Sequence, residues 1–292
     1  MSERSADILE SKIRETMPEI LDLLLRDQNR SKPSRPRNII WANDNYKEYG
    51  ATRYAATAQI KPDLITGKNG TLIMPRALKS AEMQKQRTKT QAEVFTPIRI
   101  VKLQADAIDE SYKNDDLETY IRRTWLEITC GEAPYMATRY DMGTGELIPL
   151  GKREGFVDRK LTRINAECDD LAEYQRLAEL AFKASYGFEW NGDSLLLARE
   201  NLLYTYADYY HAKWGKNPTI GLLKNIALIL SYNVFQMDGL SCTPPLTGRK
   251  KKVQGDDGYF SGFEPEPKFV TTPGNPVRVM NWNTYKMEPF GK

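Results

Sequence analysis

The chain has 292 residues, of which 40% are hydrophobic and 28% charged, and its formal net charge is +3. That length allows one large domain or two smaller ones with a buried core. Because no run of about 18 apolar residues occurs and the first residues are charged throughout, the composition argues against a membrane protein and against a secretory leader. We therefore expect a cytoplasmic protein that does not bind membranes.

Histidine and cysteine are too scarce for several enzyme classes. The chain has one histidine, His211, and three cysteines without a CxxC pair. This pattern argues against zinc fingers and a fully paired disulfide framework. A serine hydrolase needs a histidine to relay protons, and a His-rich metalloenzyme needs several to bind its metal. A single histidine therefore argues against both classes, and we expect no metal site. Because the net charge is small, a polyanionic partner must be bound by local basic clusters.

The first region, residues 1–37, is predicted to contain an amphipathic helix and a basic linker. Apolar residues recur at helical spacing over 6–27. The segment 27–37 then carries two prolines and four basic residues, which disfavours regular structure. Two interpretations stay open for this segment: a solvated tether, which a single short run favours, or a strand that contacts phosphates.

The second region, residues 38–90, is predicted to hold a hairpin and a basic stretch. In the sequence LITGKNGTLIMP, the turn residues Lys68, Asn69 and Gly70 lie between two pieces rich in β-formers, which predicts a hairpin over about 60–75. Residues 76–89 hold five basic residues and one acidic residue. We expect an exposed helix or loop there, which is either a solvated face or a nucleic-acid contact.

The third region, residues 91–292, is predicted to be an α/β domain with an insertion at 136–185. Helical periodicity predicts three helices, over about 169–185, 193–213 and 219–230. The sequence VRVM at 277–280 is the one segment after Leu240 that is typical of a buried strand.

Three apolar segments of this region end in a carboxylate, at Glu127, Glu189 and Asp238. In an α/β sheet, ligands bind at the carboxyl ends of the strands, and small residues such as Gly131 let the backbone approach them. A carboxylate after the first strand favours a positively charged ligand group. The second can hold both hydroxyls of a ribose, and the third can accept a hydrogen bond from an adenine amino group.

In this order, the segments resemble the S-adenosylmethionine-dependent N6-adenine DNA methyltransferases, the modification subunits of restriction-modification systems. Phe95-Thr96-Pro97 is similar to the FTP element of that family, and Leu126–Ala133 is similar to its L-D/E-P-A-C-G-x-G loop. Gly187–Leu203 resembles its G-x-E…L-A-R-x-N-L-L segment, and Asp238-Gly239-Leu240 resembles its G-D-x-L element. Four motifs in one order are more specific than any single glycine loop.

The resemblance implies a Rossmann-like methyltransferase fold that binds S-adenosyl-L-methionine. Thr96 would lie near the methionine carboxylate and Glu127 near the methionine amino group. The backbone around Cys130 and Gly131 would pass beneath the cofactor. The complete set of cofactor-binding residues implied in this way is Phe95, Thr96, Glu127, Cys130, Gly131, Glu189, Trp190 and Asp238.

The sequence departs from the family at the catalytic D/N-P-P-Y/F tetrapeptide, which is missing. Cys242-Thr243-Pro244-Pro245 has the prolines but neither the polar head nor the aromatic residue. The segment 281–285 follows VRVM where the tetrapeptide is expected. We therefore expect Asn281 to orient the target amine and Trp282 or Tyr285 to stack on a flipped base. The alternative is a polar turn near the chain end.

The family's sheet has three further strands beyond this point, whereas the chain has seven residues after Tyr285. The resemblance therefore predicts an incomplete or rearranged C-terminal half of the sheet, behind a helical N-terminal extension. A partner subunit would supply target recognition.

Three functions follow from these patterns. The first is an adenine-N6 DNA methyltransferase of a restriction-modification or phage or mobile-element system. The second is a catalytically inactive DNA-binding or assembly subunit that keeps the cofactor fold. The third, a nuclease, needs carboxylates and a lysine around a metal; Asp63 with Lys68 and Asp158 with Lys160 are the candidate pairs, and such pairs arise easily by chance.

Overall fold

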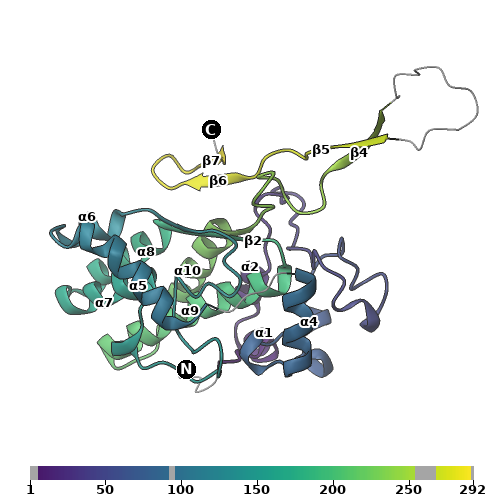
Figure 1. The fold of residues 1–292 in the computed structure, drawn as a ribbon. Coiled ribbons are helices and arrows are strands. Elements are labelled where there is room, and N and C mark those ends of the chain that lie inside the picture. The colour runs from purple at the N-terminus through teal and green to yellow at the C-terminus, as the bar shows by residue number, and fades with distance from the viewer. Residues whose placement is uncertain (1–5, 92–95, 254–267, 291–292) are drawn as a thin grey trace, which may run out of the picture.

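A small parallel sheet lies at the centre of the molecule, which is a mixed α/β protein (Figure 1). The computed structural model describes residues 6–91, 96–253 and 268–290. The sheet contains β1 (Trp125–Glu127), β2 (Ser185–Glu189) and β3 (Val234–Gln236), which are parallel and lie in the order β1-β2-β3. Their carboxyl ends therefore meet at one edge, and the acids predicted to end each strand are brought to neighbouring strands.

Helices connect these strands and form most of the core. Two helices, α7 (Phe156–Glu167) and α8 (Leu171–Lys183), join β1 to β2, and two more, α9 (Gly192–Trp214) and α10 (Ile220–Asn233), join β2 to β3. The three helices predicted over 169–185, 193–213 and 219–230 are therefore confirmed. Before β1 lie α5 (Ile98–Asp109) and α6 (Leu117–Arg122), with a 3₁₀ turn at Glu110–Tyr112 between them.

The N-terminal amphipathic segment forms two short helices, α1 (Glu10–Thr16) and α2 (Pro18–Leu24), instead of one. Pro18 has no backbone N–H to donate the next helical hydrogen bond of α1, so α1 ends before it. Proline is favoured in the first turn of a helix, where α2 begins. The buried apolar side chains of both helices, together with those of α7 and α8, belong to the same core as α9. One core therefore spans all three predicted regions.

The hairpin predicted near residues 60–75 is wrong. That segment contains α3 (Pro62–Ile65) and the 3₁₀ turn Gly67–Asn69. Leu64 and Ile65 are both buried, which an alternating strand does not allow but a helical turn does. Two further 3₁₀ turns lie at Lys47–Tyr49 and Arg76–Leu78, and the basic stretch continues as α4 (Ala81–Gln91).

Two antiparallel ribbons follow the parallel sheet along the chain. The first pairs β4 (Arg249–Val253) with β5 (Lys268–Thr272), and it extends away from the rest of the molecule (Figure 1). The second pairs β6 (Arg278–Asn281) with β7 (Lys286–Pro289). VRVM therefore forms a strand, as predicted, but in the described residues that strand pairs with β7 and not with the parallel sheet.

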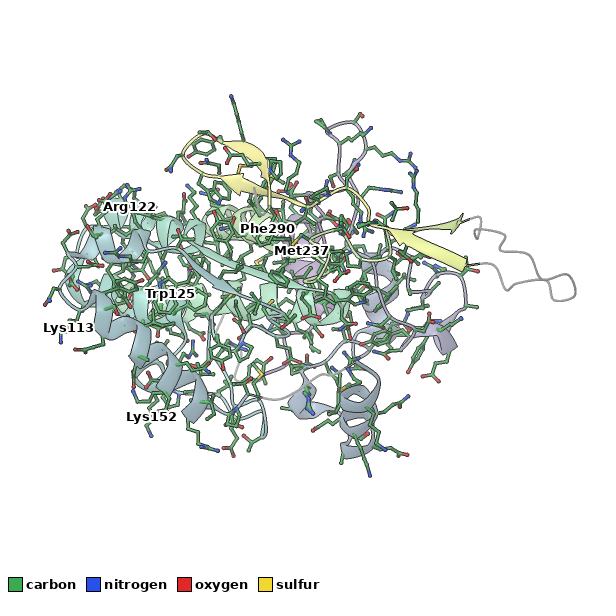
Figure 2. All side chains as sticks on the ribbon, turned by 45° about the horizontal axis from the view of Figure 1, so that its top comes forward. Lys113, Arg122, Trp125, Lys152, Met237 and Phe290 are labelled. Atoms are coloured by element: carbon green, nitrogen blue, oxygen red, sulfur yellow. The ribbon has the colours of Figure 1, made fainter. Side chains whose placement is uncertain are left out.

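The β6–β7 hairpin covers one face of the sheet. Val277 and Phe290, which flank it, pack on Phe188, Phe235 and Met237 (Figure 2). A two-residue period puts Tyr186 on the same face as Phe188, and its hydroxyl donates to the Met280 carbonyl at 3.2 Å.

Gly192, the first residue of α9, allows the N-terminal chain to pass very close to that helix. Its amide donates to the Trp41 carbonyl at 3.0 Å, and an added Cβ would lie 2.0 Å from the Ile40 carbonyl oxygen. We expect Gly192→Ala to lower the free energy of unfolding by about 2–3 kcal/mol, measured by urea denaturation, because the backbone must move. In Gly221→Ala, the new methyl meets nothing nearer than 3.8 Å, so this helical control is expected to be neutral or slightly stabilising. Equal losses in both variants would contradict this explanation.

Among the described residues, no helix combines the length and the apolar character that a membrane crossing requires.

Candidate functional site

A large cleft lies at the carboxyl ends of β1 and β2. Its volume is about 1520 Å³, which is larger than the roughly 300–1,000 Å³ typical of small-molecule sites. One wall is the loop after β1 together with residues 189–194 after β2. Residues 42–49 form a second part of the lining, which we call the N-terminal wall, and Arg76 and residues of α4 complete it. The cleft is therefore lined by the ends of β1 and β2, by α4 and by the N-terminal segment 42–49.

Six of the eight predicted cofactor-binding residues line this cleft. They come from three separate motifs: Thr96, Glu127, Cys130, Gly131, Glu189 and Trp190. Phe95, the seventh, lies outside the residues that the structure describes. Asp238, the eighth, is not among the lining residues.

The loop after β1 has an unusual backbone conformation. Thr129, Gly131 and Ala133 all have positive φ angles, of 48°, 54° and 61°. This region is unfavourable for residues with a Cβ, and such conformations concentrate at ligand sites. A Cβ added to Gly131 would meet nothing within 4 Å, so its bare backbone is open to the cleft.

Glu189 joins the two strand ends that form the cleft wall. Its side chain is 7% exposed and accepts hydrogen bonds from the Gly131 amide, at 2.9 Å, and from the Asn191 amide, at 2.9 Å. Burial raises the pKa of this carboxyl group. The next residue, Trp190, donates from its indole nitrogen to the Ala42 carbonyl at 2.8 Å, which joins the N-terminal wall to the end of β2.

Glu127 is buried at the end of β1, with 6% of its surface exposed. It accepts from the amides of Tyr135, at 3.2 Å, and Met136, at 2.9 Å, and so holds the far end of the loop. Burial raises its pKa to about 8, and the charge of Glu189 adds to this effect. Near neutral pH this group therefore carries a proton for much of the time.

The raised pKa of Glu127 links folding stability to pH. Glu127 keeps its proton in the folded chain, but the unfolded chain releases it above the ordinary value of 4.5. The contribution of this group to the free energy of unfolding is therefore fully present below pH 4.5. It is lost as the pH rises toward 8, by up to about 1.4 kcal/mol per pH unit. Glutamine does not titrate, so Glu127→Gln lacks this loss. We expect its free energy of unfolding minus that of the parent, measured by urea denaturation, to be about 2–3 kcal/mol higher at pH 7.5 than at pH 5. Parallel pH profiles of parent and variant would contradict the assignment.

Asp238 follows β3 by two residues, as predicted, but its carboxylate closes its own turn. It accepts from the Leu240 amide at 2.9 Å and from the Ser241 hydroxyl at 2.7 Å. The strand order thus brings the three acids to neighbouring strand ends, while only Glu127 and Glu189 line the cleft.

Asn281 and Trp282 lie away from this cleft. The Trp282 indole donates to the Asn233 side chain at 2.8 Å, and the Asn233 amide donates to the carbonyl of Ser185, the first residue of β2. Ser185 and Glu189 are four residues apart, about 13 Å along a strand. The Asn281 side chain is bonded to Glu288 across the hairpin. The structure therefore does not bring the two residues predicted to be catalytic together with Glu127 and Glu189.

Sequence reasoning missed the network around Asp193 that holds the N-terminal wall in place. The buried Asp193 carboxylate accepts from Asn43 at 3.2 Å, from the Tyr46 hydroxyl at 2.7 Å and from Arg87 of α4 at 2.8 Å. Although burial raises its pKa, the charges of Arg87 and Lys79 and these hydrogen bonds lower it to about 2. No local sequence pattern indicates this wall, because Tyr46 and Arg87 lie 147 and 106 positions from Asp193.

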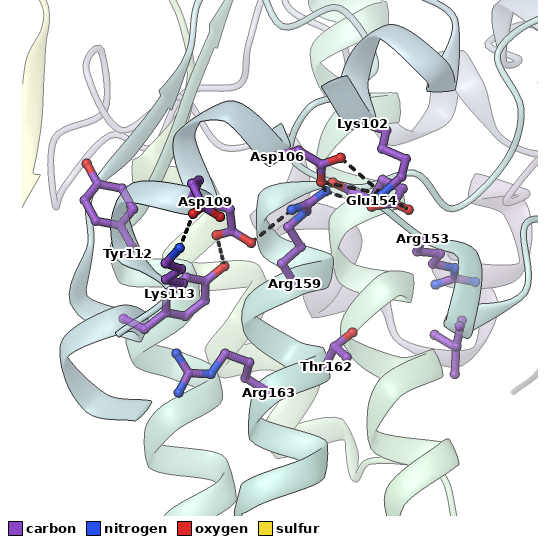
Figure 3. A pocket seen from close by; sticks show the side chains of 14 residues that line it. Lys102, Asp106, Asp109, Tyr112, Lys113, Arg153, Glu154, Arg159, Thr162 and Arg163 are labelled. Atoms are coloured by element: carbon purple, nitrogen blue, oxygen red, sulfur yellow. Dashed lines mark hydrogen bonds and ion pairs between the residues drawn. The ribbon is translucent and has the colours of Figure 1, made fainter. Parts of the chain in front are cut away.

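A second pocket, of about 580 Å³, lies between α5, α6 and α7 (Figure 3). Its charges largely neutralise one another, because Arg159 pairs with Asp106, Asp109 and Glu154. We assign no ligand to it.

The residue pairs considered for a nuclease are also accounted for within the fold. Asp63 pairs with Arg53 instead of Lys68. The buried Asp158 accepts from the Thr138 amide, and Lys160 donates to the Arg123 carbonyl. Within the described ranges, no group of three or more His, Cys, Asp or Glu side chains is placed to hold a metal ion.

Comparison of the chain with protein-family models, with curated proteins and with solved structures finds no match.

Proposed function

We propose that the cleft binds S-adenosylmethionine and that the chain serves adenine-N6 methylation of DNA. The observation that carries this proposal is the convergence of Thr96, Glu127 and Glu189, from three separate motifs, on one hollow at adjacent strand ends. The proposal includes the fold: β1, β2 and β3 would be one half of a Rossmann-like methyltransferase sheet.

The residues present fit this cofactor. Glu189 accepts three hydrogen bonds, from the amides of Gly131 and Asn191 and from the Asn191 side chain, which leaves one lone-pair site for a ribose hydroxyl; the second hydroxyl would take the place of the Asn191 side chain. The open backbone at Gly131 leaves room for a ligand to lie against the loop. Glu127, once ionised, can pair with an ammonium group, and the Thr96 hydroxyl, hydrogen-bonded to Tyr135, borders the same space.

When bound, S-adenosylmethionine supplies an electrophilic methyl group on its sulfonium. The work of this chain is then to position the donor and to exclude water from it. The wall at 42–49 would receive the acceptor base, because Asp44 and Tyr49 are exposed on the cleft there and an aromatic face can stack on a flipped base. We place this activity in the cytoplasm, within a restriction-modification or mobile-element system, with a partner subunit for target recognition.

A second candidate is a non-catalytic subunit that keeps the cofactor site. The position of Trp282, bonded to Asn233 beside the start of β2, favours this candidate, because the residues predicted to handle the amine are not in the cleft.

A methyl-transfer assay separates the two. The purified chain is incubated with donor labelled in its methyl group and with mixed double-stranded DNA, with and without extract of its host. We expect label in N6-methyladenine. Donor binding without transfer under either condition would favour the non-catalytic subunit, and neither binding nor transfer would contradict both.

A further inference from the structure

Three segments distant in the sequence form one strongly basic surface. The segments 28–37, 239–253 and 268–278 together hold ten lysines and arginines and no acidic residue, although the whole chain has a net charge of only +3. We call these three segments the basic surface. Among its cations, those described as exposed are Lys32, Arg35, Arg37, Arg249 and Arg278.

Hydrogen bonds hold the three segments side by side. Arg30 donates to the Pro245 carbonyl at 2.8 Å, and the Arg278 amide donates to the Asn29 side chain at 2.6 Å. The Val277 amide donates to the Cys242 carbonyl at 2.8 Å. Arg30 pairs with Asp27, which precedes the first segment, so the exposed cations and not Arg30 give this surface its charge. Like charges held close together favour binding of a polyanion that neutralises them.

The β4–β5 ribbon gives this surface a shape as well as a charge. It is a two-stranded antiparallel ribbon that extends from the body, and the strand at 249–253 has the sequence RKKKV (Figure 1). The major groove of B-form DNA, about 12 Å wide, admits a two-stranded ribbon. The major groove of A-form RNA is deep and narrow, and side chains cannot read it. The geometry therefore favours duplex DNA.

We propose that the basic surface binds the phosphate backbone of double-stranded DNA, with the β4–β5 ribbon lying in or along a groove. Where the surface delivers DNA to the cleft, the inference rests on the proposed function; the binding itself does not require a methyl donor. Arg37 precedes the cleft residue Ala42 by five positions. Five residues span at most about 17 Å. One turn of a DNA duplex is longer, about 34 Å, so a single duplex can reach from Arg37 to the cleft.

Fluorescence anisotropy with a labelled 20-base-pair DNA duplex of arbitrary sequence, without S-adenosylmethionine, tests this surface. The ribbon variant is K250Q/K251Q/K252Q. Its matched control is K113Q/R122Q/K152Q, which removes the same charge from exposed residues on the side of the molecule opposite β4–β5 (Figure 2). A second variant, K32Q/R35Q, tests the arm, whose turn is closed by a backbone bridge between Lys32 and Arg35.

We expect the parent to bind with a steep dependence on salt. If all three ribbon lysines contact phosphates, the slope of log K against log salt becomes less negative by about 2.7 in the ribbon variant and by about 1.8 in the arm variant. At 100 mM salt, the ribbon variant should bind at least tenfold more weakly, and the control should remain within twofold of the parent.

Equal losses in the ribbon variant and the control would overturn the proposal, since only net charge would then matter. Tighter binding of a 20-base-pair RNA duplex than of DNA would overturn the choice of partner. Glu189→Ala distinguishes this proposal from the cofactor site: it should bind DNA as the parent does, whatever happens to its affinity for S-adenosylmethionine.

Discussion

Replacing Arg199 with leucine is expected to lower the free energy of unfolding by about 4 kcal/mol, a large part of the 5–15 kcal/mol typical of a folded protein. The guanidinium is fully buried and donates to the carbonyls of Leu24, Arg26, Ser231 and Val234 at 2.6–3.3 Å. These carbonyls lie at the ends of α2 and α10 and at the start of β3. Leucine would leave them buried without a donor.

Urea denaturation at neutral pH checks this expectation. Arg199→Lys keeps a positive charge but not the planar set of five donors, so we expect it to recover less than half of the loss. Arg122→Gln, which removes an exposed arginine paired with Glu118, should change the free energy of unfolding by less than about 0.5 kcal/mol. A loss below about 1 kcal/mol in Arg199→Leu would show that water or neighbouring groups replace the guanidinium.

Replacing Glu189 with alanine is expected to weaken S-adenosylmethionine binding by at least about 100-fold. Hydrogen bonds to a charged group contribute about 1.5–3 kcal/mol each, so two lost ribose contacts correspond to that factor. The substitution also removes the acceptor for the Gly131 amide, which shapes the loop beneath the ligand. Isothermal calorimetry with the full chain measures the effect.

Asp238→Ala is the matched control for Glu189→Ala, because its carboxylate follows the neighbouring strand but closes a local turn. We expect its affinity for S-adenosylmethionine to stay within about threefold of that of the parent. This change is smaller than the loss of one hydrogen bond to a charged group would cause. If Glu189→Ala binds as tightly as the parent while its thermal unfolding is unchanged, the ribose assignment is wrong.

The part of the site that could be predicted from sequence is the part encoded locally. Glu127 and Glu189 each end a short apolar run, and this pattern indicates a strand end without knowledge of any distant residue. The small residues after Glu127 likewise indicate a tight loop. Both predictions need only about ten residues of context, and the structure places both acids in the cleft.

The N-terminal wall could not be predicted in this way. Tyr46 and Arg87 reach Asp193 across 147 and 106 positions of the chain, and no local periodicity encodes such contacts. Arg87 is the buried cation of a helix that is otherwise largely exposed, so the basic run around it is typical of a solvated face.

The C-terminal strand shows a different limit. VRVM has the pattern of a buried strand, and it forms β6. Alternation gives which residues of a strand are buried, but it does not specify the partner strand. In the β6–β7 hairpin only Met280 of this strand is buried, and the position of Asn281 depended on which partner the strand took.

Photochemical cross-linking of labelled S-adenosylmethionine to the full chain, followed by peptide mapping, tests the central claim most directly. We predict label in peptides that contain residues 127–135 or Trp190, and its loss when unlabelled S-adenosylhomocysteine is in excess. Label confined to peptides outside the cleft, or no label that the competitor displaces, would contradict the account.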